Sequence, residues 1–200
     1  MSCTTMHLDE YTYYTIYKMT QTIFINLTGG PCCGKTTTAA SLFSELKRAG
    51  INAELLTEPV KDYIYEENNS AISSQIKLFA EALYKMKQLD GKADVVVTDC
   101  PLLHNIVYDQ EDNKVFHTLV IQEYNKFTNI DFFLERGDMP FEQFGRIHSY
   151  QQSVELDNKI KMVYNYANAP YITVDNEHAV EQIMETIYPS KEQVPIDEED

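Results

Sequence analysis

The sequence predicts a single α/β domain built around a five-stranded parallel sheet, with helices on both faces of the sheet. Short apolar runs typical of strands alternate with segments whose apolar residues recur at helical spacing, which is the pattern of parallel βαβ units. The 200 residues are enough for one such domain with a sizeable core. No repeat or linker divides the chain. We therefore expect one domain over residues 21–188, an N-terminal extension over residues 1–20 and an acidic, disordered tail over residues 189–200.

The first half of the predicted domain contains two strands and two helices before a polar break at Asn68-Asn69-Ser70. Apolar residues in the first long helix share one face, and Gly50 ends it. The second strand closes at Glu58-Pro59, where proline fixes the exit of the backbone. In order, we expect a strand at residues 23–27, a helix at about 36–49, a strand at 52–57 and a short helix near 60–66.

The second half continues the alternation of helices and strands. Apolar residues spaced by three or four predict an amphipathic helix that ends at Asp90-Gly91. The run Val95-Val96-Val97 suits a central strand that is buried on both sides. In order, we expect a helix at residues 71–90, a strand at 94–99, a helix at 112–127, a strand at 130–135, a helix at 151–167, a strand at 171–174 and a helix at 177–187.

A phosphate-binding loop is the strongest motif in the chain. Residues 29–36 read Gly-Gly-Pro-Cys-Cys-Gly-Lys-Thr and fit the template of glycine, any four residues, then Gly-Lys-Thr. A strand precedes the loop and a helix follows it, so its amides and the helix N-terminus converge on one anion. We expect the Lys35 ammonium group to bind the β- and γ-phosphates and the Thr36 hydroxyl to bind Mg²⁺. The predicted nucleotide-binding residues are Gly29, Gly30, Pro31, Cys32, Cys33, Gly34, Lys35, Thr36 and Thr37.

Ligands of open parallel sheets bind at the carboxyl ends of the strands, so the residues that follow each strand are candidate site residues. Asp99 follows Val95-Val96-Val97-Thr98, which is the place of a carboxylate that holds Mg²⁺. Thr36 and Asp99 are therefore the predicted metal ligands. The alternative is that Asp99 only caps the turn before Cys100-Pro101.

Glu58 ends the second strand. A carboxylate there suits a general base that accepts the proton of an attacking substrate hydroxyl. A solvated loop glutamate is the alternative interpretation.

The stretch between Arg136 and Arg146 contains turn residues and aromatics and has no helical period, which is typical of a lid. Phosphoryl transfer spreads negative charge over the equatorial oxygens, and guanidinium groups neutralise that charge. We therefore expect a catalytic role for at least one of these two arginines. The alternative is pairing with the acids that this chain carries in excess.

Composition limits the classes of partner. The formal charge is −15, with 31 acidic and 16 basic residues, which argues against a broad nucleic-acid footprint without excluding a small basic cleft. The four cysteines show no metal-binding spacing, so we expect a reducing cytosol and no structural zinc. No apolar stretch approaches the roughly 20 residues of a membrane helix, and no signal-peptide layout is present. We expect a cytoplasmic protein, and a homodimer is compatible with the sequence.

Together, the loop at residues 29–36, Glu58-Pro59, Thr98-Asp99-Cys100-Pro101 and the stretch from Arg136 to Arg146 resemble a P-loop nucleoside or nucleotide kinase. More narrowly, they resemble the small NadR-type ATPase and kinase proteins often encoded by bacteriophages, over residues 22–174. The resemblance implies a P-loop NTPase fold with strand order 2-3-1-4-5, ATP with Mg²⁺ as donor, and a substrate between the second strand and the lid. A phage origin would place the protein in the host cytoplasm.

The match to the kinases is incomplete on the acceptor side. Glu58 matches the glutamate of the Glu-Pro motif in deoxynucleoside kinases, and Gln75 is a candidate for the glutamine that pairs with the base there. Those kinases carry Glu-Arg-Ser after strand three, where this chain has Asp99-Cys100-Pro101. Thymidylate kinases carry an arginine before Glu-Pro, where this chain has Thr57. The acceptor is therefore not assigned by the motifs.

Several function classes are compatible with these motifs. The leading hypothesis is a kinase that transfers the γ-phosphoryl of ATP to a nucleoside, a nucleoside monophosphate or a related small molecule such as nicotinamide riboside. The alternatives are a phage kinase acting on a hydroxymethylated base in DNA and an ATPase without a small acceptor. A regulatory GTP switch requires an Asn-Lys-x-Asp motif, and both Asn113-Lys114-Val115-Phe116 and Asn158-Lys159-Ile160-Lys161 lack the aspartate.

Overall fold

The computed structural model describes residues 21–57, 60–68, 72, 74–137 and 149–188. A five-stranded sheet of order β2-β3-β1-β4-β5 forms its centre, and all four strand pairs are parallel. This arrangement confirms the predicted α/β fold and strand order. The predicted N-terminal extension and acidic tail lie outside the described residues.

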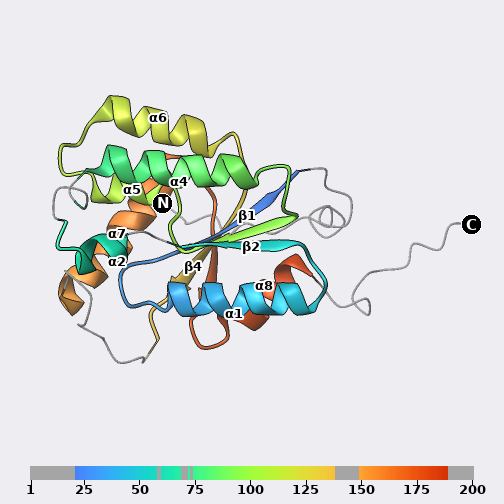
Figure 1. Ribbon diagram of the computed structural model, residues 1–200. Helices are drawn as coiled ribbons and strands as arrows, with labels where there is room; N and C mark the ends of the chain where they lie inside the picture. Colours follow the sequence, from blue (N-terminus) through green and yellow to red (C-terminus); the bar gives the residue numbers. More distant parts are fainter. Residues whose placement is uncertain (1–20, 58–59, 69–71, 73, 138–148, 189–200) are drawn as a thin grey trace, which may run out of the picture.

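Strands and helices alternate through most of the described chain (Figure 1). The five strands are β1 Ile23–Thr28, β2 Ala53–Leu56, β3 Val95–Thr98, β4 Thr128–Glu135 and β5 Ile172–Asp175. The helices are α1 Lys35–Arg48, α2 Val60–Tyr65, α4 Gln75–Leu89, α5 His104–Tyr108, α6 Lys114–Tyr124, α7 Tyr150–Tyr166 and α8 Ala179–Ile187.

The sheet is covered on both faces because its strands are apolar on both sides. Figure 1 shows α1 and α8 together on one face, while α4, α5, α6 and α7 cover the other. On β1, Ile23 and Ile25 contribute to the core beneath α1 and α8, whereas Phe24 contributes to the opposite core. All three side chains are at most 2% exposed, so burial on both faces holds β1 at the centre of the sheet.

Parallel pairing brings the carboxyl ends of the strands to one edge. Leu56 at the end of β2 pairs with Thr98 at the end of β3, and Asn26 of β1 pairs with the same threonine. Leu134 of β4 pairs with Val174 of β5. The loops that follow these strands therefore leave the sheet on the same side, as the sequence predicted.

Among the helices of the described residues, α5 was not predicted. The five-residue helix α5 begins at His104, whose N–H donates to the Pro101 carbonyl over 3.0 Å. A helix of this length is too short to show a 3.6-residue period, and all of its first four residues are buried, so no polar face marks it in the sequence. In the described part of the chain, no helix combines the length and apolar character that crossing a membrane requires.

Candidate phosphate-binding site

The loop between β1 and α1 has the backbone conformation of an anion-binding nest. Gly29, Cys32 and Gly34 have positive φ angles of 139°, 62° and 88°. Left-handed residues within such a turn direct successive amide N–H groups to one side. Helix α1 begins directly at Lys35, so the first amides of the helix, which have no intrahelical acceptor, extend the same set of donors.

Lys35 lies folded back over the loop. Its Nζ donates to the carbonyl oxygens of Gly29 and Gly30 over 2.7 and 2.8 Å, and it lies 3.8 Å from the Cys33 sulfur. The ammonium group is therefore held at the mouth of the loop by neutral acceptors. A phosphate oxygen is a stronger acceptor for a cation than these carbonyls, because the resulting hydrogen bond is between charged groups.

Thr36 and Asp99, the two predicted metal ligands, are joined by a hydrogen bond. The Thr36 hydroxyl donates to Asp99 Oδ2 over 2.6 Å, which joins the first turn of α1 to the end of β3. Asp99 is buried, with only 4% of its surface exposed. A hydroxyl and a carboxylate fit Mg²⁺, which binds few protein oxygens and completes its shell with water and phosphate. Among the described residues, no group of three or more His, Cys, Asp or Glu forms a separate metal cluster.

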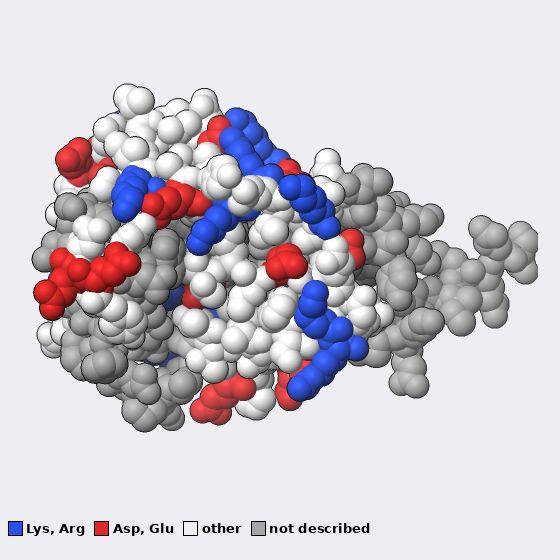
Figure 2. All heavy atoms as spheres, viewed as in Figure 1, with Lys and Arg blue, Asp and Glu red and all other residues white. Residues whose placement is uncertain are grey.

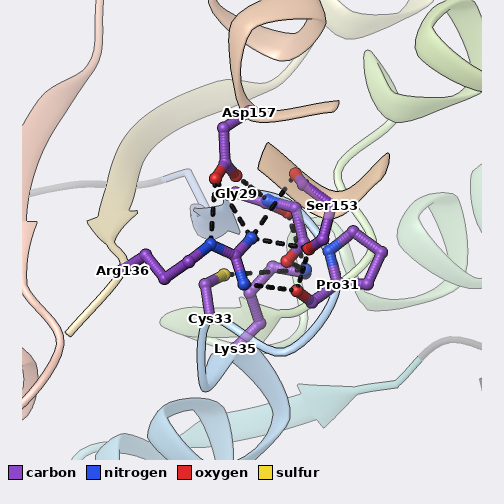
Figure 3. A network of polar contacts seen from close by, with 8 residues as sticks. Gly29, Pro31, Cys33, Lys35, Arg136, Ser153 and Asp157 are labelled. Atoms are coloured by element: carbon purple, nitrogen blue, oxygen red, sulfur yellow. Dashed lines mark hydrogen bonds and ion pairs between the residues drawn. The ribbon is translucent and has the colours of Figure 1, made fainter. Parts of the chain in front are cut away.

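Arg136 contacts the loop from the other side (Figure 3). It follows the end of β4, and its Nη1 donates to the Pro31 carbonyl over 2.9 Å. Its Nη2 donates to the Ser153 hydroxyl over 2.7 Å, and the guanidinium forms an ion pair with Asp157 at 3.0 Å. Asp157 also accepts from the Gly30 N–H over 2.6 Å. Helix α7 therefore lies against the phosphate loop.

This geometry agrees with the comparison of the sequence to protein families. Residues 24–182 match the family described as AAA domain, which is more than half of the chain. The chain belongs to the AAA domain family. No curated protein matches the sequence.

Solved structures share the fold of this AAA domain. A NadR protein in complex with NAD and AMP-PNP superposes with a TM-score of 0.63 at 14% identity, covering 87% of this chain and 52% of the NadR chain. This AAA domain therefore spans about half the length of that protein. Thymidylate kinase from Ehrlichia chaffeensis superposes with a TM-score of 0.56 at 14% identity, covering 83% of this chain and 98% of the kinase. At this identity the likeness establishes a P-loop kinase-like fold.

Two buried polar residues join helix α5 of this AAA domain to the end of β1. His104 Nε2 lies 2.7 Å from Thr28 Oγ1, at the end of β1 just before the loop. Burial, followed by the nearby Lys35 ammonium, lowers the pKa of His104 to about 3. The ring is therefore neutral at neutral pH and adds no charge to the site. A lone histidine in a short, unpredicted helix gave no sequence signal for this contact.

A second buried polar group lies in the sheet, where β4 pairs with Asn26 of β1. Asp131 of β4 accepts hydrogen bonds from the hydroxyls of Tyr124 and Tyr164, over 2.5 and 2.8 Å. Burial raises the pKa of Asp131 to about 7, although its hydrogen-bond donors act in the opposite direction. Asp131 lies on the same face of the sheet as Phe133, beneath the helices that supply both tyrosines.

The structure brings together the loop residues 29–37, Asp99 and Arg136 from the set predicted by sequence. Glu58, Arg146 and most of the predicted lid lie outside the described residues. Gln75 is the first residue of α4 and is half-buried. Ser153 and Asp157 were missed, because a serine and an aspartate on a polar helix have no motif that marks them.

Charge is mixed on the surface in view. On the face shown in Figure 2, the described Lys and Arg side chains are spread among Asp, Glu and uncharged residues. In the described part of the chain, several charges are paired with opposite charges, including Arg48 with Glu45 and Lys87 with Glu123. This distribution is unlike the concentrated basic surface by which proteins hold a nucleic-acid backbone.

Proposed function

We propose that this AAA domain is an ATP- and Mg²⁺-dependent phosphotransferase that moves the γ-phosphoryl group of ATP to a nucleoside, a nucleoside monophosphate or a related small molecule. The contact between Thr36 and Asp99 carries the proposal, because it joins the nucleotide loop to a buried carboxylate at the end of the neighbouring strand. The fold shared with a NadR protein bound to AMP-PNP and with a thymidylate kinase supports the same class.

Donor binding rests on the loop and on Lys35. The amides of residues 32–37 would surround the phosphate oxygens, with the helix N-terminus adding its positive end. Lys35 would exchange the carbonyls of Gly29 and Gly30 for oxygens of the β- and γ-phosphates. Thr36 and Asp99 would hold Mg²⁺, directly or through water. When bound, the ion neutralises charge on the phosphate oxygens.

Acceptor activation is assigned to Glu58. Because Leu56 pairs with Thr98, the chain leaves β2 at the edge where Asp99 lies. With a nucleoside or nicotinamide riboside as acceptor, its hydroxyl oxygen would bond to the γ-phosphorus while the bond from this phosphorus to the oxygen bridging the β- and γ-phosphates breaks. ADP takes the electron pair of the broken bond, and the hydroxyl proton passes to the Glu58 carboxylate. Arg146 of the predicted lid, or Arg136 if it exchanges its present contacts with Asp157 and Pro31 for the phosphate, would neutralise charge on the transferred group.

A screen of acceptors tests the proposal. Purified protein with MgATP would be incubated with nucleosides, nucleoside monophosphates and nicotinamide riboside, and ADP release would be measured. Release that depends on one acceptor supports a small-molecule kinase. ADP formed at the same rate without any acceptor would identify an ATPase. Duplex DNA with hydroxymethylated bases, tested by filter binding and ADP release, would identify the DNA-modifying alternative if it alone is retained and phosphorylated.

A further inference from the structure

We infer that Asp157 and Ser153 of α7 act as positioning residues for the phosphate loop, and that Arg136 acts with them in holding the loop. The three residues are called the α7 clamp below. The clamp goes beyond the proposed function because it assigns a role to two residues of α7, and its effect on nucleotide affinity rests on the proposed function.

The clamp requires an unusually close approach of α7 to Gly30. A Cβ atom added to Gly30 would lie 2.6 Å from Asp157 Oδ1, 2.6 Å from the Ser153 carbonyl oxygen and 3.0 Å from Arg136 Nη2. Only glycine leaves space for these groups, since one of the three is backbone and does not swing away. The absence of a side chain at residue 30 is therefore what lets Asp157 reach the Gly30 N–H.

All three guanidinium nitrogens of Arg136 donate hydrogen bonds within the clamp and to the loop. Its Nε and Nη2 both donate to Asp157 Oδ2, over 3.2 and 3.0 Å, and its Nη1 donates to the Pro31 carbonyl. The Arg136 side chain is 13% exposed and that of Asp157 is 16% exposed. Partly buried, charge-assisted bonds of this kind are stronger than exposed ion pairs. Every nitrogen of Arg136 thus has an acceptor on the loop or on α7.

The clamp fixes the orientation of the Cys32 amide by holding the Pro31 carbonyl of the same peptide unit. This oxygen accepts from both Arg136 Nη1 and the Ser153 hydroxyl. The peptide unit is planar and trans, so the Cys32 N–H points opposite to the Pro31 carbonyl. Holding the carbonyl on the α7 side directs the Cys32 N–H away from α7, as a nest requires.

The clamp also supports a strained residue. Cys32 has a φ of 62°, a conformation that non-glycine residues rarely adopt. The residue before it is fixed through its carbonyl by Arg136 and Ser153, and Lys35 holds the carbonyls of Gly29 and Gly30. Consecutive carbonyls of the loop are therefore held by side chains, and this restraint keeps the left-handed turn in place before nucleotide binds.

Hydrogen exchange of the nucleotide-free protein tests the clamp independently of the proposed function. Asp157→Ala removes the acceptor of the Gly30 N–H, so exchange in the 29–34 segment should accelerate about tenfold or more. Glu155→Gln, which removes an exposed acidic charge from the same helix, is the matched control and should leave exchange unchanged. Equal protection in the wild type and in Asp157→Ala overturns the clamp.

Calorimetric titration with MgATP tests the consequence for binding. Arg136→Ala and Asp157→Ala should each weaken MgATP binding about tenfold. Because the two residues act together, the double variant should lose no more MgATP affinity than the more affected single variant. Asp157→Asn should recover part of the loss, because its amide oxygen still accepts from the Gly30 N–H. Arg136→Lys should not, because an ammonium cannot reach three acceptors in the planar fork geometry. Thermal melting without nucleotide identifies any variant that fails to fold.

The same titrations separate the clamp from a direct phosphate contact of Arg136. If Arg136 serves the phosphates, Asp157→Ala frees the guanidinium, and MgATP affinity stays equal or increases while Arg136→Ala still weakens it. That pattern overturns the positioning role. Failure of the wild type to bind any nucleotide would remove the proposed function, whereas the exchange experiment would still decide whether the clamp exists.

Discussion

Thr36 and Asp99, which are 63 positions apart in the chain, meet through a 2.6 Å hydrogen bond between a hydroxyl and a carboxylate. The contact joins the nucleotide loop to the strand beside it. It also brings together the two side-chain oxygens to which the proposed function assigns Mg²⁺.

Lys35→Ala should abolish ATP turnover, because a positive charge at the phosphates is lost. The fold should persist, since Lys35 contacts loop carbonyls and not the core. ADP release and the melting temperature are the measurements. Lys47→Ala, which removes an exposed lysine from the same helix, should retain wild-type turnover. Full turnover by Lys35→Ala would remove Lys35 from the donor site.

Asp99→Asn should raise the Mg²⁺ concentration needed for half-maximal ATP turnover by about tenfold or more, because an amide is a weaker ligand for a hard cation than a carboxylate. Thr36→Ala should act in the same direction, whereas Thr36→Ser keeps the hydroxyl and should remain close to wild type. A magnesium titration of the initial rate measures the effect. Asp90→Asn, at an exposed carboxylate, is the control. An unchanged magnesium requirement in Asp99→Asn would reduce Asp99 to a turn cap.

Glu58→Gln should lower the maximal rate by about a hundredfold or more while MgATP affinity changes little, because general-base catalysis contributes on this scale and the donor binds elsewhere. Glu54→Gln, which alters an exposed glutamate on β2, is the control. The maximal rate with a saturating acceptor and the dissociation constant of MgATP are measured side by side. A Glu58→Gln enzyme at full rate would reduce Glu58 to a solvated loop residue.

Asp131→Asn should become more stable relative to the wild type as pH rises from about 4 to 7. The folded-state pKa of Asp131 is raised to about 7 from the ordinary value of 3.8. Between these values the folded protein holds a proton that the unfolded chain has released, so the contribution of Asp131 is lost as pH rises. The expected change in the free-energy difference is about 1 kcal/mol per pH unit within this window.

Urea unfolding of both proteins at several pH values measures this difference. Asp90→Asn should show no such trend relative to the wild type, because Asp90 is exposed. A pH-independent difference for Asp131→Asn would show that Asp131 is not buried as described.

The neutral His104 provides a test of opposite sign. Its pKa is lowered to about 3 from 6.5, so its contribution to stability is lost as pH falls. Relative to the wild type, His104→Gln should therefore gain stability below about pH 6.5, as measured by the same urea unfolding.

Local sequence patterns were sufficient to predict the strand and helix that contribute to the core of the fold. The run Val95-Val96-Val97 predicted a strand buried on both faces, and β3 lies between β1 and β2. The spacing of Leu42 and Leu46 predicted the buried face of α1. These predictions succeeded because burial imposes a period on the residues of a single element, and that period is visible in the sequence.

The sequence by itself determined the alternation of strands and helices, the glycine-rich loop with Lys35 and Thr36, and the placement of Asp99 at the end of a strand. Only the tertiary structure decided that Asp157 and Ser153 hold Gly30 and Pro31, that His104 pairs with Thr28, and that Asp131 is buried between two tyrosines. The physical reason is distance along the chain. The conformation of a loop and the period of a helix depend on residues that are close together in the sequence. The hydrogen bond between Gly30 and Asp157 joins residues 127 positions apart and forms only after the sheet and its helices have packed.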